Sequence, residues 1–209
     1  MIADAAFMAV LGLAALLSAI VMRGARPASR SYLHFAAVLY LALAAADEIA
    51  IVFAQVAGFA DAVTLVVSAM APVALALSLF ASFEHPPKSW AATVFLLLAL
   101  ACAIGAAMTG AAVLSFAPLS ASVFAMLALS LRRWRIEQRG PFHAILSALC
   151  FLIAAASGAS GGAMGRTGLA LFSAAGILGI SLALARRSRP PVTEPRAKDL
   201  RFTAISGPG

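Results

Sequence analysis

Long apolar runs separated by short segments of Arg, Pro or Gly divide the chain into seven candidate membrane spans. The runs cover residues 3–22, 32–57, 62–83, 89–109, 112–131, 142–160 and 167–185. Each is close to the roughly 20 residues that an α-helix needs to cross the hydrocarbon core. The period-two alternation of a membrane β-barrel is absent from them. The pattern therefore predicts an all-α integral membrane protein, built as a seven-helix transmembrane bundle.

The composition supports this prediction and excludes a soluble fold. Of the 209 residues, 63% are hydrophobic and 11% are charged, whereas soluble domains have about 45–50% apolar and about 25% charged residues. The spans occupy residues 1–185 and leave no room for a soluble domain. Residues 186–209 form a basic, Pro-rich tail. We expect the tail to attract anionic lipid headgroups and to offer a docking segment for a partner protein.

The basic residues predict the orientation of the spans. When the spans alternate across the bilayer, 14 of the 15 Lys and Arg residues fall on one side, and only Arg166 falls on the other. The positive-inside rule then places the amino terminus outside and the carboxyl terminus in the cytoplasm, and a bacterial inner membrane is the expected location. Because every basic cluster adjoins a helix end, topology and anionic headgroups account for the net charge of +7, and nucleic acid is not an expected partner.

Weak self-similarity suggests an internal repeat. Residues 30–34 and 139–143 both read Arg-x-x-apolar-His at the entrance of a span. Ser-Ala pairs and the Pro pairs that follow them recur at residues 68–69, 86–87, 173–174 and 190–191. Spans one to three would then recur as spans five to seven in the same orientation, with span four as the connector. This three-plus-one-plus-three parallel repeat resembles the topology of the SWEET sugar transporters, although the Pro-Gln pair expected in such repeats is missing. The alternative is that Ala- and Leu-rich runs align with one another without a common origin.

Two adjacent acids, Asp47 and Glu48, are the only charged residues deep in any predicted span. They lie within about 5 Å of the middle of the span over 32–57. An ionised carboxylate there costs about 2.5–3.5 kcal/mol, so we expect at least one of the two acids to be neutral or satisfied by its neighbours. An acid that changes its protonation state is the central element of a proton-coupled site. The alternative is a neutral acid that fastens two helices through hydrogen bonds.

Polar stripes on three spans predict a pocket around these acids. Tyr40 and Gln55 lie on the faces of the acids at heptad spacing. Thr64 and Ser68 belong to a polar stripe on the span over 62–83, and Ser147 and Ser157 to one on the span over 142–160. If the three stripes face one another, they line a central proton or solute pocket. The alternative is that these hydroxyls bond their own backbone carbonyls.

Three histidines, His34, His85 and His143, lie at predicted cytoplasmic helix ends, and Glu84 precedes His85. These residue types are ligands for metals, and two histidines can hold a haem. No His-x-x-His or Glu-x-x-His pair occurs, so no cofactor is predicted and the four residues are only metal candidates. Cys102 and Cys150 are expected to be free thiols.

These observations favour a proton-linked carrier of a small solute. One alternative is a non-transporting membrane module, either sensory or an accessory subunit of a larger complex. Another is a membrane enzyme with a haem or metal bound by histidines. No catalytic residue is predicted, because no nucleophile–base pair or phosphate-binding loop is found, and an enzyme is the less favoured interpretation.

Overall fold

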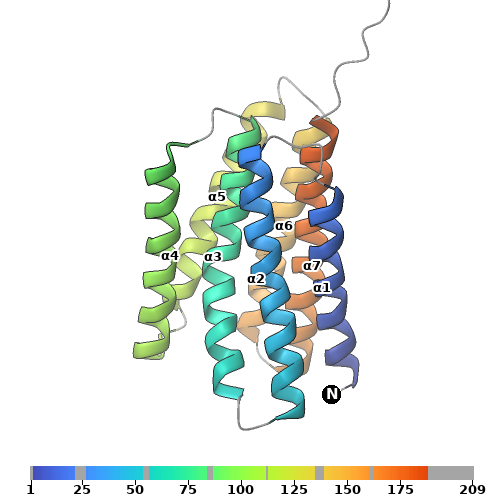
Figure 1. Ribbon diagram of the computed structural model, residues 1–209, viewed down its shortest axis with the longest axis vertical. Coiled ribbons are helices and arrows are strands. Elements are labelled where there is room, and N and C mark those ends of the chain that lie inside the picture. Colours follow the sequence, from blue (N-terminus) through green and yellow to red (C-terminus); the bar gives the residue numbers. More distant parts are fainter. Residues whose placement is uncertain are drawn as a thin grey trace, which may run out of the picture.

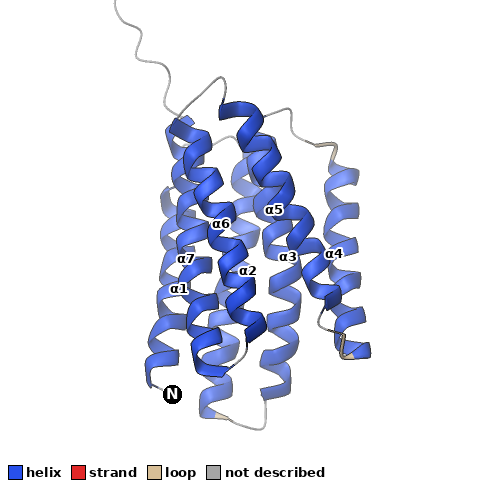
Figure 2. Ribbon diagram, turned by 180° about the vertical axis from the view of Figure 1, so that it is seen from behind, coloured by secondary structure: helices blue, strands red, loops and turns tan. Residues whose placement is uncertain are grey.

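The computed structural model describes residues 2–21, 27–53, 57–83, 87–111, 113–134, 139–160 and 162–187 of the chain. These residues form seven helices and no strand (Figures 1 and 2). The helices are α1 (Ile2–Val21), α2 (Pro27–Val52), α3 (Ala57–Phe83), α4 (Ser89–Thr109), α5 (Val113–Trp134), α6 (Arg139–Ser160) and α7 (Gly162–Arg187). The all-helical fold is thus confirmed for the described residues. Most of the predicted tail, residues 188–209, lies outside them.

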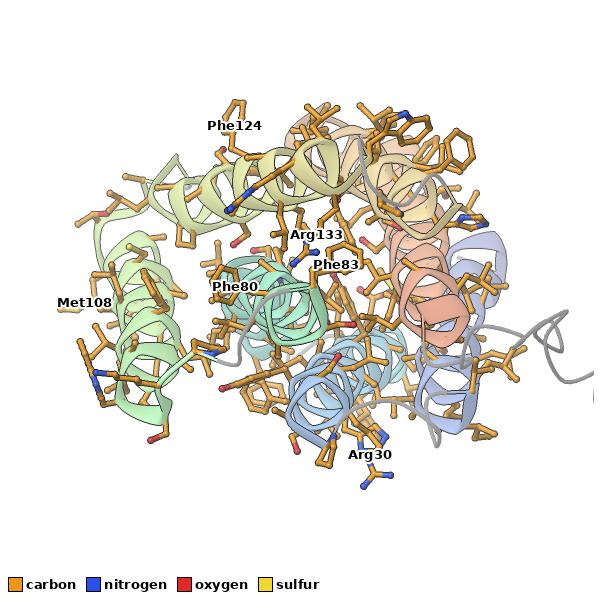
Figure 3. All side chains as sticks on the ribbon, turned by 90° about the horizontal axis from the view of Figure 1, so that it is seen from above. Arg30, Phe80, Phe83, Met108, Phe124 and Arg133 are labelled. Carbon is orange, nitrogen blue, oxygen red and sulfur yellow. The ribbon has the colours of Figure 1, made fainter. Side chains whose placement is uncertain are left out.

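Six of the helices form a ring, and α4 lies outside it. Consecutive helices run in opposite directions (Figure 1). Around the ring, α1 packs against α2, α2 against α3, α3 against α5, α5 against α6, α6 against α7, and α7 against α1. Helix α4 packs mainly against α3 and α5, and the view along the bundle shows it to one side (Figure 3). The ring therefore consists of two triplets of consecutive helices, and α4 connects them.

Helix α2 begins five residues before the predicted span over 32–57 and ends five residues before its end. Pro27 is its first residue. Proline favours the first helical position, because its fixed φ suits the helix and its missing N–H would have no helical partner there. The apolar content of residues 27–31 is low, so hydropathy alone places the start of this helix too late.

Among the described residues, four helices are long and apolar enough to cross a membrane. These segments are Pro27–Ala50, Gly58–Phe83, Ser89–Thr109 and Thr167–Ala185. Shorter apolar stretches cover Met8–Val21 in α1 and Pro141–Ser157 in α6. Large apolar side chains also face outward, as Met108 and Phe124 do in Figure 3. An apolar outer surface on apolar helices is typical of a membrane-embedded protein.

The interior of the ring is filled by apolar side chains from all six ring helices. Many of them are alanines, and Leu11, Leu33, Leu75, Phe151 and Ile177 are among the largest that are almost fully buried. Helix α4 has a separate, smaller contact with α3, formed largely by alanines such as Ala69, Ala92, Ala99 and Ala103. Small residues permit close helix approach, which is how membrane helices gain packing energy in the absence of a hydrophobic force between them.

Helices α6 and α7 approach each other closely because α7 carries glycines along the shared face. A Cβ atom at Gly176 would lie 2.6 Å from the Phe151 ring, and a Cβ at Gly168 would lie 2.5 Å from the Ser157 hydroxyl. A Cβ at Gly179 would overlap the hydroxyl of Ser147. Distances this short mean that side chains of α6 occupy the space that a larger residue on α7 would need.

Hydrogen bonds to backbone carbonyls join α3 to two neighbours. The Ser29 hydroxyl of α2 donates to the Ser78 carbonyl at 2.8 Å, and both residues are buried. The Arg133 guanidinium of α5 donates to the carbonyl of Phe83, the last residue of α3. Figure 3 shows Arg133 and Phe83 pointing toward each other between α5 and α3. The arginine thereby supplies a donor to a carbonyl that has no partner within its own helix.

Candidate functional site

The two acids of α2 lie in its second half and are both half-buried. The midpoint of α2 falls between residues 39 and 40, so Asp47 and Glu48 are about 11 and 13 Å from it at 1.5 Å per residue. They are therefore nearer to a helix end than the sequence predicted, because the helix is shifted toward Pro27. A hydrocarbon core of about 30 Å, if centred on this midpoint, would include both positions.

Asp47 lies on the face of α2 that is directed into the ring. Tyr40, one heptad earlier, is 4% exposed, and its hydroxyl is hydrogen-bonded to the side chain of Ser173 on α7. Residues one heptad apart lie on nearly the same side of a helix, so Asp47 shares the inward side of Tyr40. The Oδ2 atom of Asp47 is buried.

Glu48 lies on a different face, toward α1. The His34 Nε2 atom, two heptads before Glu48, is 3.3 Å from the Ala19 carbonyl oxygen of α1. Leu41, one heptad before Glu48, is on the same side, because a Cβ atom at Gly12 of α1 would lie 3.7 Å from its Cδ2 atom. The adjacent acids are thus about 100° apart around α2, and their surroundings differ.

The predicted polar residues of α3 are close in space to α2, since these two helices are neighbours. Thr64 and Ser68 are half-buried, and each hydroxyl donates to a carbonyl of its own helix. The acceptors are the carbonyls of Ala60, at 2.8 Å, and Leu65, at 3.0 Å. Such local bonds satisfy a hydroxyl without a ligand, which was the alternative interpretation of the stripe.

The predicted polar residues of α6 lie elsewhere in the bundle. Ser147 donates to the carbonyl of His143 at 2.7 Å, and Ser147 and Ser157 both lie against glycines of α7. Helix α6 packs against α5 and α7, and it is not a neighbour of α2 or α3 in the ring. The three predicted stripes are therefore not brought to one shared contact. Gln55 lies outside the described residues.

Two of the three histidines are described, and they lie on helices that do not pack against each other. His34 of α2 is exposed, and half-buried His143 of α6 has its ring edge-on to that of Phe142, with a centroid distance of 5.7 Å. His85 and Glu84 lie outside the described residues. Within the described part of the chain, no three His, Cys, Asp or Glu side chains gather into a set that could hold a metal ion. Cys102 and Cys150 are free thiols, as predicted.

Sequence reasoning missed the role of Ser173 as the partner of Tyr40. Ser173 is 4% exposed and lies near the middle of α7, where a polar residue is a weak signal of an interhelical contact. Its partner could not be identified from the sequence, because nothing in it shows that α2 and α7 face each other across the ring. The hydroxyls of Tyr40 and Ser173 thus form a buried polar contact one heptad from Asp47, on the inward side of α2.

Comparisons with known proteins add no relative: no protein-family model matches the chain, and searches of curated proteins and of solved structures found no similar protein.

Proposed function

We propose that the protein is a small inner-membrane carrier that couples the movement of a small solute to protons, with Asp47 and Glu48 as the groups that change protonation state. The observation that carries the proposal is the position of Asp47. This acid is on the inward side of α2, in line with the buried contact between Tyr40 and Ser173. Ionisable residues inside a membrane domain that face the bundle interior commonly mark ion or substrate pathways.

The proposed topology has seven spans, with the amino terminus outside and the carboxyl terminus in the cytoplasm. Its support is that the described basic side chains Arg30, Lys88, Arg132 and Arg133 lie at one end of the bundle. Arg30 and Lys88 are near the starts of α2 and α4, and the other two are at the end of α5. With helices of alternating direction, these positions all belong to the same end (Figure 1). That end is the cytoplasmic one by the positive-inside rule.

The arrangement of the ring supports the proposed internal repeat. Helices α1–α3 form one triplet and α5–α7 the other, and corresponding helices run in the same direction. The contact of α3 with α5 has its counterpart in the contact of α7 with α1. Parallel repeats related by an axis along the membrane normal are one of the ways in which transporters are built, with the substrate near the interface of the repeats.

In the proposed mechanism, the protonated acids are neutral and stable in the low-dielectric interior, whereas the ionised acids need a partner or water. Loss of a proton therefore changes which arrangement of the helices around α2 is the more stable one. The Tyr40 and Ser173 hydroxyls can each donate and accept a hydrogen bond, so they can hand a proton to or from the inward side of α2. A carrier needs this kind of coupling between protonation and helix packing.

The proposal is tested by proton flux into liposomes that contain the purified protein and a trapped pH-sensitive dye. We expect Asp47→Asn and Glu48→Gln each to reduce the flux after a pH step. Asp61→Asn is the matched control, because Asp61 is an exposed acid in the first turns of α3, at the same end of the bundle as Asp47. Wild-type flux in both acid variants excludes the carrier and leaves the two alternatives, the sensory or accessory module and the membrane enzyme with a haem or metal bound by histidines.

A further inference from the structure

The contact between Tyr40 and Ser173 fixes the relative height of α2 and α7. The two helices run in opposite directions, so a step toward the carboxyl end of α2 corresponds to a step toward the amino end of α7. One heptad along each helix leads from Tyr40 to Asp47 and from Ser173 to Arg166. A heptad step covers about 10.5 Å and returns to nearly the same side of a helix. Asp47 and position 166 are therefore in register across the ring.

The distances from the helix midpoints lead to the same correspondence. Position 166 is about 13 Å from the midpoint of α7, toward its start, and Asp47 is about 11 Å from the midpoint of α2, toward its end. The start of α7 and the end of α2 belong to the same end of the bundle (Figure 1). The heptad step from the Tyr40–Ser173 contact and the distances from the helix midpoints thus both place Asp47 and position 166 at the same height in the bundle.

Arg166 is also the one basic residue of the sequence whose position the positive-inside rule does not explain. The other 14 Lys and Arg residues belong to the predicted cytoplasmic side, where the positive-inside rule accounts for them. A basic residue on the opposite side, in the first turns of a helix that crosses the membrane, needs a different reason. Charged residues inside membrane domains typically pair with one another, and a carboxylate in register supplies that reason.

We propose that Arg166 is the fixed counter-charge of Asp47, so that α2 and α7 are coupled by an acid–base pair near the outer boundary of the membrane. The ionised form of Asp47 pairs with Arg166 and holds the two helices in register, and the pair is lost when Asp47 takes up a proton. Resting on the proposed function, this links the protonation of Asp47 to the contact between α2 and α7. Arg166 is then a positioning residue, which affects transport by holding the carboxylate of Asp47.

The pair is tested by a double-mutant cycle on the full chain in detergent. The readout is the apparent Tm, taken as the temperature at which half of the monodisperse protein is lost. Removing one partner of a charge pair inside a membrane domain leaves the other uncompensated, so Asp47→Asn and Arg166→Gln are each expected to lower the apparent Tm by roughly 6 °C or more. The double variant is expected to lower the apparent Tm by less than the sum of the two single-variant losses. Additive losses overturn the proposal.

The matched control is the cycle between Glu48→Gln and Arg166→Gln, which is expected to be additive because Glu48 lies on the side of α2 toward α1. If Arg166→Gln does not accumulate as folded protein, recovery of the double variant supports the pair, and failure to recover overturns it. Arg166→Lys retains the charge and is expected to stay closer to the wild type in apparent Tm than Arg166→Gln does; equal losses also overturn the proposal.

Proton flux separates this inference from the proposed function. In liposomes, Arg166→Gln is expected to reduce the flux, as Asp47→Asn does, because each variant removes the proton-dependent pair. If the wild type carries no protons, the carrier fails, but the coupling in stability between Asp47 and Arg166 is still measured. If flux is present and the cycle is additive, the pair fails and the carrier stands.

Discussion

The close packing of α6 on α7 makes a quantitative prediction for Gly176→Ala. An added Cβ atom would lie 2.6, 2.8 and 2.9 Å from three atoms of the Phe151 ring. Phe151 is 1% exposed, so its ring has no free space into which it can move. Overpacking of this kind costs about 1–3 kcal/mol. Alanine is also a better helix former than glycine by about 1 kcal/mol, which offsets part of that cost.

Gly105→Ala separates these two terms. A Cβ atom at Gly105 of α4 would lie 3.6 Å from the Leu114 Cδ1 atom, an ordinary contact distance. This variant gains the same helix propensity without strain, so the two alanine variants differ by the strain alone. A difference of about 1–3 kcal/mol corresponds to roughly 2–12 °C in Tm for a chain of this size.

The assay is the apparent Tm in detergent for both glycine variants, measured side by side. We expect Gly176→Ala to melt below Gly105→Ala by that margin. A smaller side chain at 151 relieves the overlap, so Gly176→Ala is expected to be less harmful in a Phe151→Leu background than in the wild type. Equal melting of the two alanine variants, or no relief by Phe151→Leu, would refute the reasoning from the α6–α7 contact.

Three further variants test contacts between ring helices by the same measurement. Ser29→Ala removes the donor to the Ser78 carbonyl between α2 and α3 and is expected to cost about 0.6–1.5 kcal/mol, or roughly 1–6 °C. Arg133→Gln removes the guanidinium donor to the Phe83 carbonyl between α5 and α3, with an expected loss of about 1–2 kcal/mol, or roughly 2–8 °C. Tyr40→Phe keeps the buried ring but removes the hydroxyl bonded to α7, with an expected loss of about 1 kcal/mol, or roughly 2–4 °C.

Each of these variants has a control. Ser31→Ala removes an exposed hydroxyl that bonds the Pro27 carbonyl of its own helix, and the apparent Tm is expected to stay unchanged. A loss equal to that of Ser29→Ala contradicts the assignment of an interhelical bond. For Tyr40, Ser173→Ala on top of Tyr40→Phe is expected to add little, and a fully additive loss argues against the hydroxyl contact. Arg133→Lys keeps a donor and is expected to lose less than Arg133→Gln.

The number and type of helices could be predicted from the sequence, because apolar runs of about 20 residues have few structural solutions in a membrane. The helix boundaries predicted from hydropathy were less accurate where a helix extends past its apolar part. Pro27 is a helix-start signal, but hydropathy placed the start at residue 32. The shift moved Asp47 away from the middle of its helix. The depth of a charged residue is therefore only as reliable as the boundary of its span.

The candidate site was only partly predictable, because helix neighbours are a tertiary property. Spacing placed Tyr40 on the same side as Asp47, but it could not identify Ser173 as the partner of Tyr40. Periodicity cannot distinguish a hydroxyl that lines a pocket from one that bonds the previous turn, as Thr64 and Ser147 do. Both arrangements have the same sequence pattern, so a structure is needed to separate them.

If the proposed repeat arose by duplication, the position of α4 has a consequence for how the two copies were joined. A unit of three antiparallel helices begins and ends on opposite sides of the bilayer, so a second copy joined directly to the first would insert upside down. One additional crossing restores the direction and needs no place in the ring. Helix α4, which lies outside the ring, has the position expected of such a connector. Selection on α4 would then act mainly on its ability to insert as a connector, and the sequence of its outward surface would be free to diverge faster than that of the six ring helices.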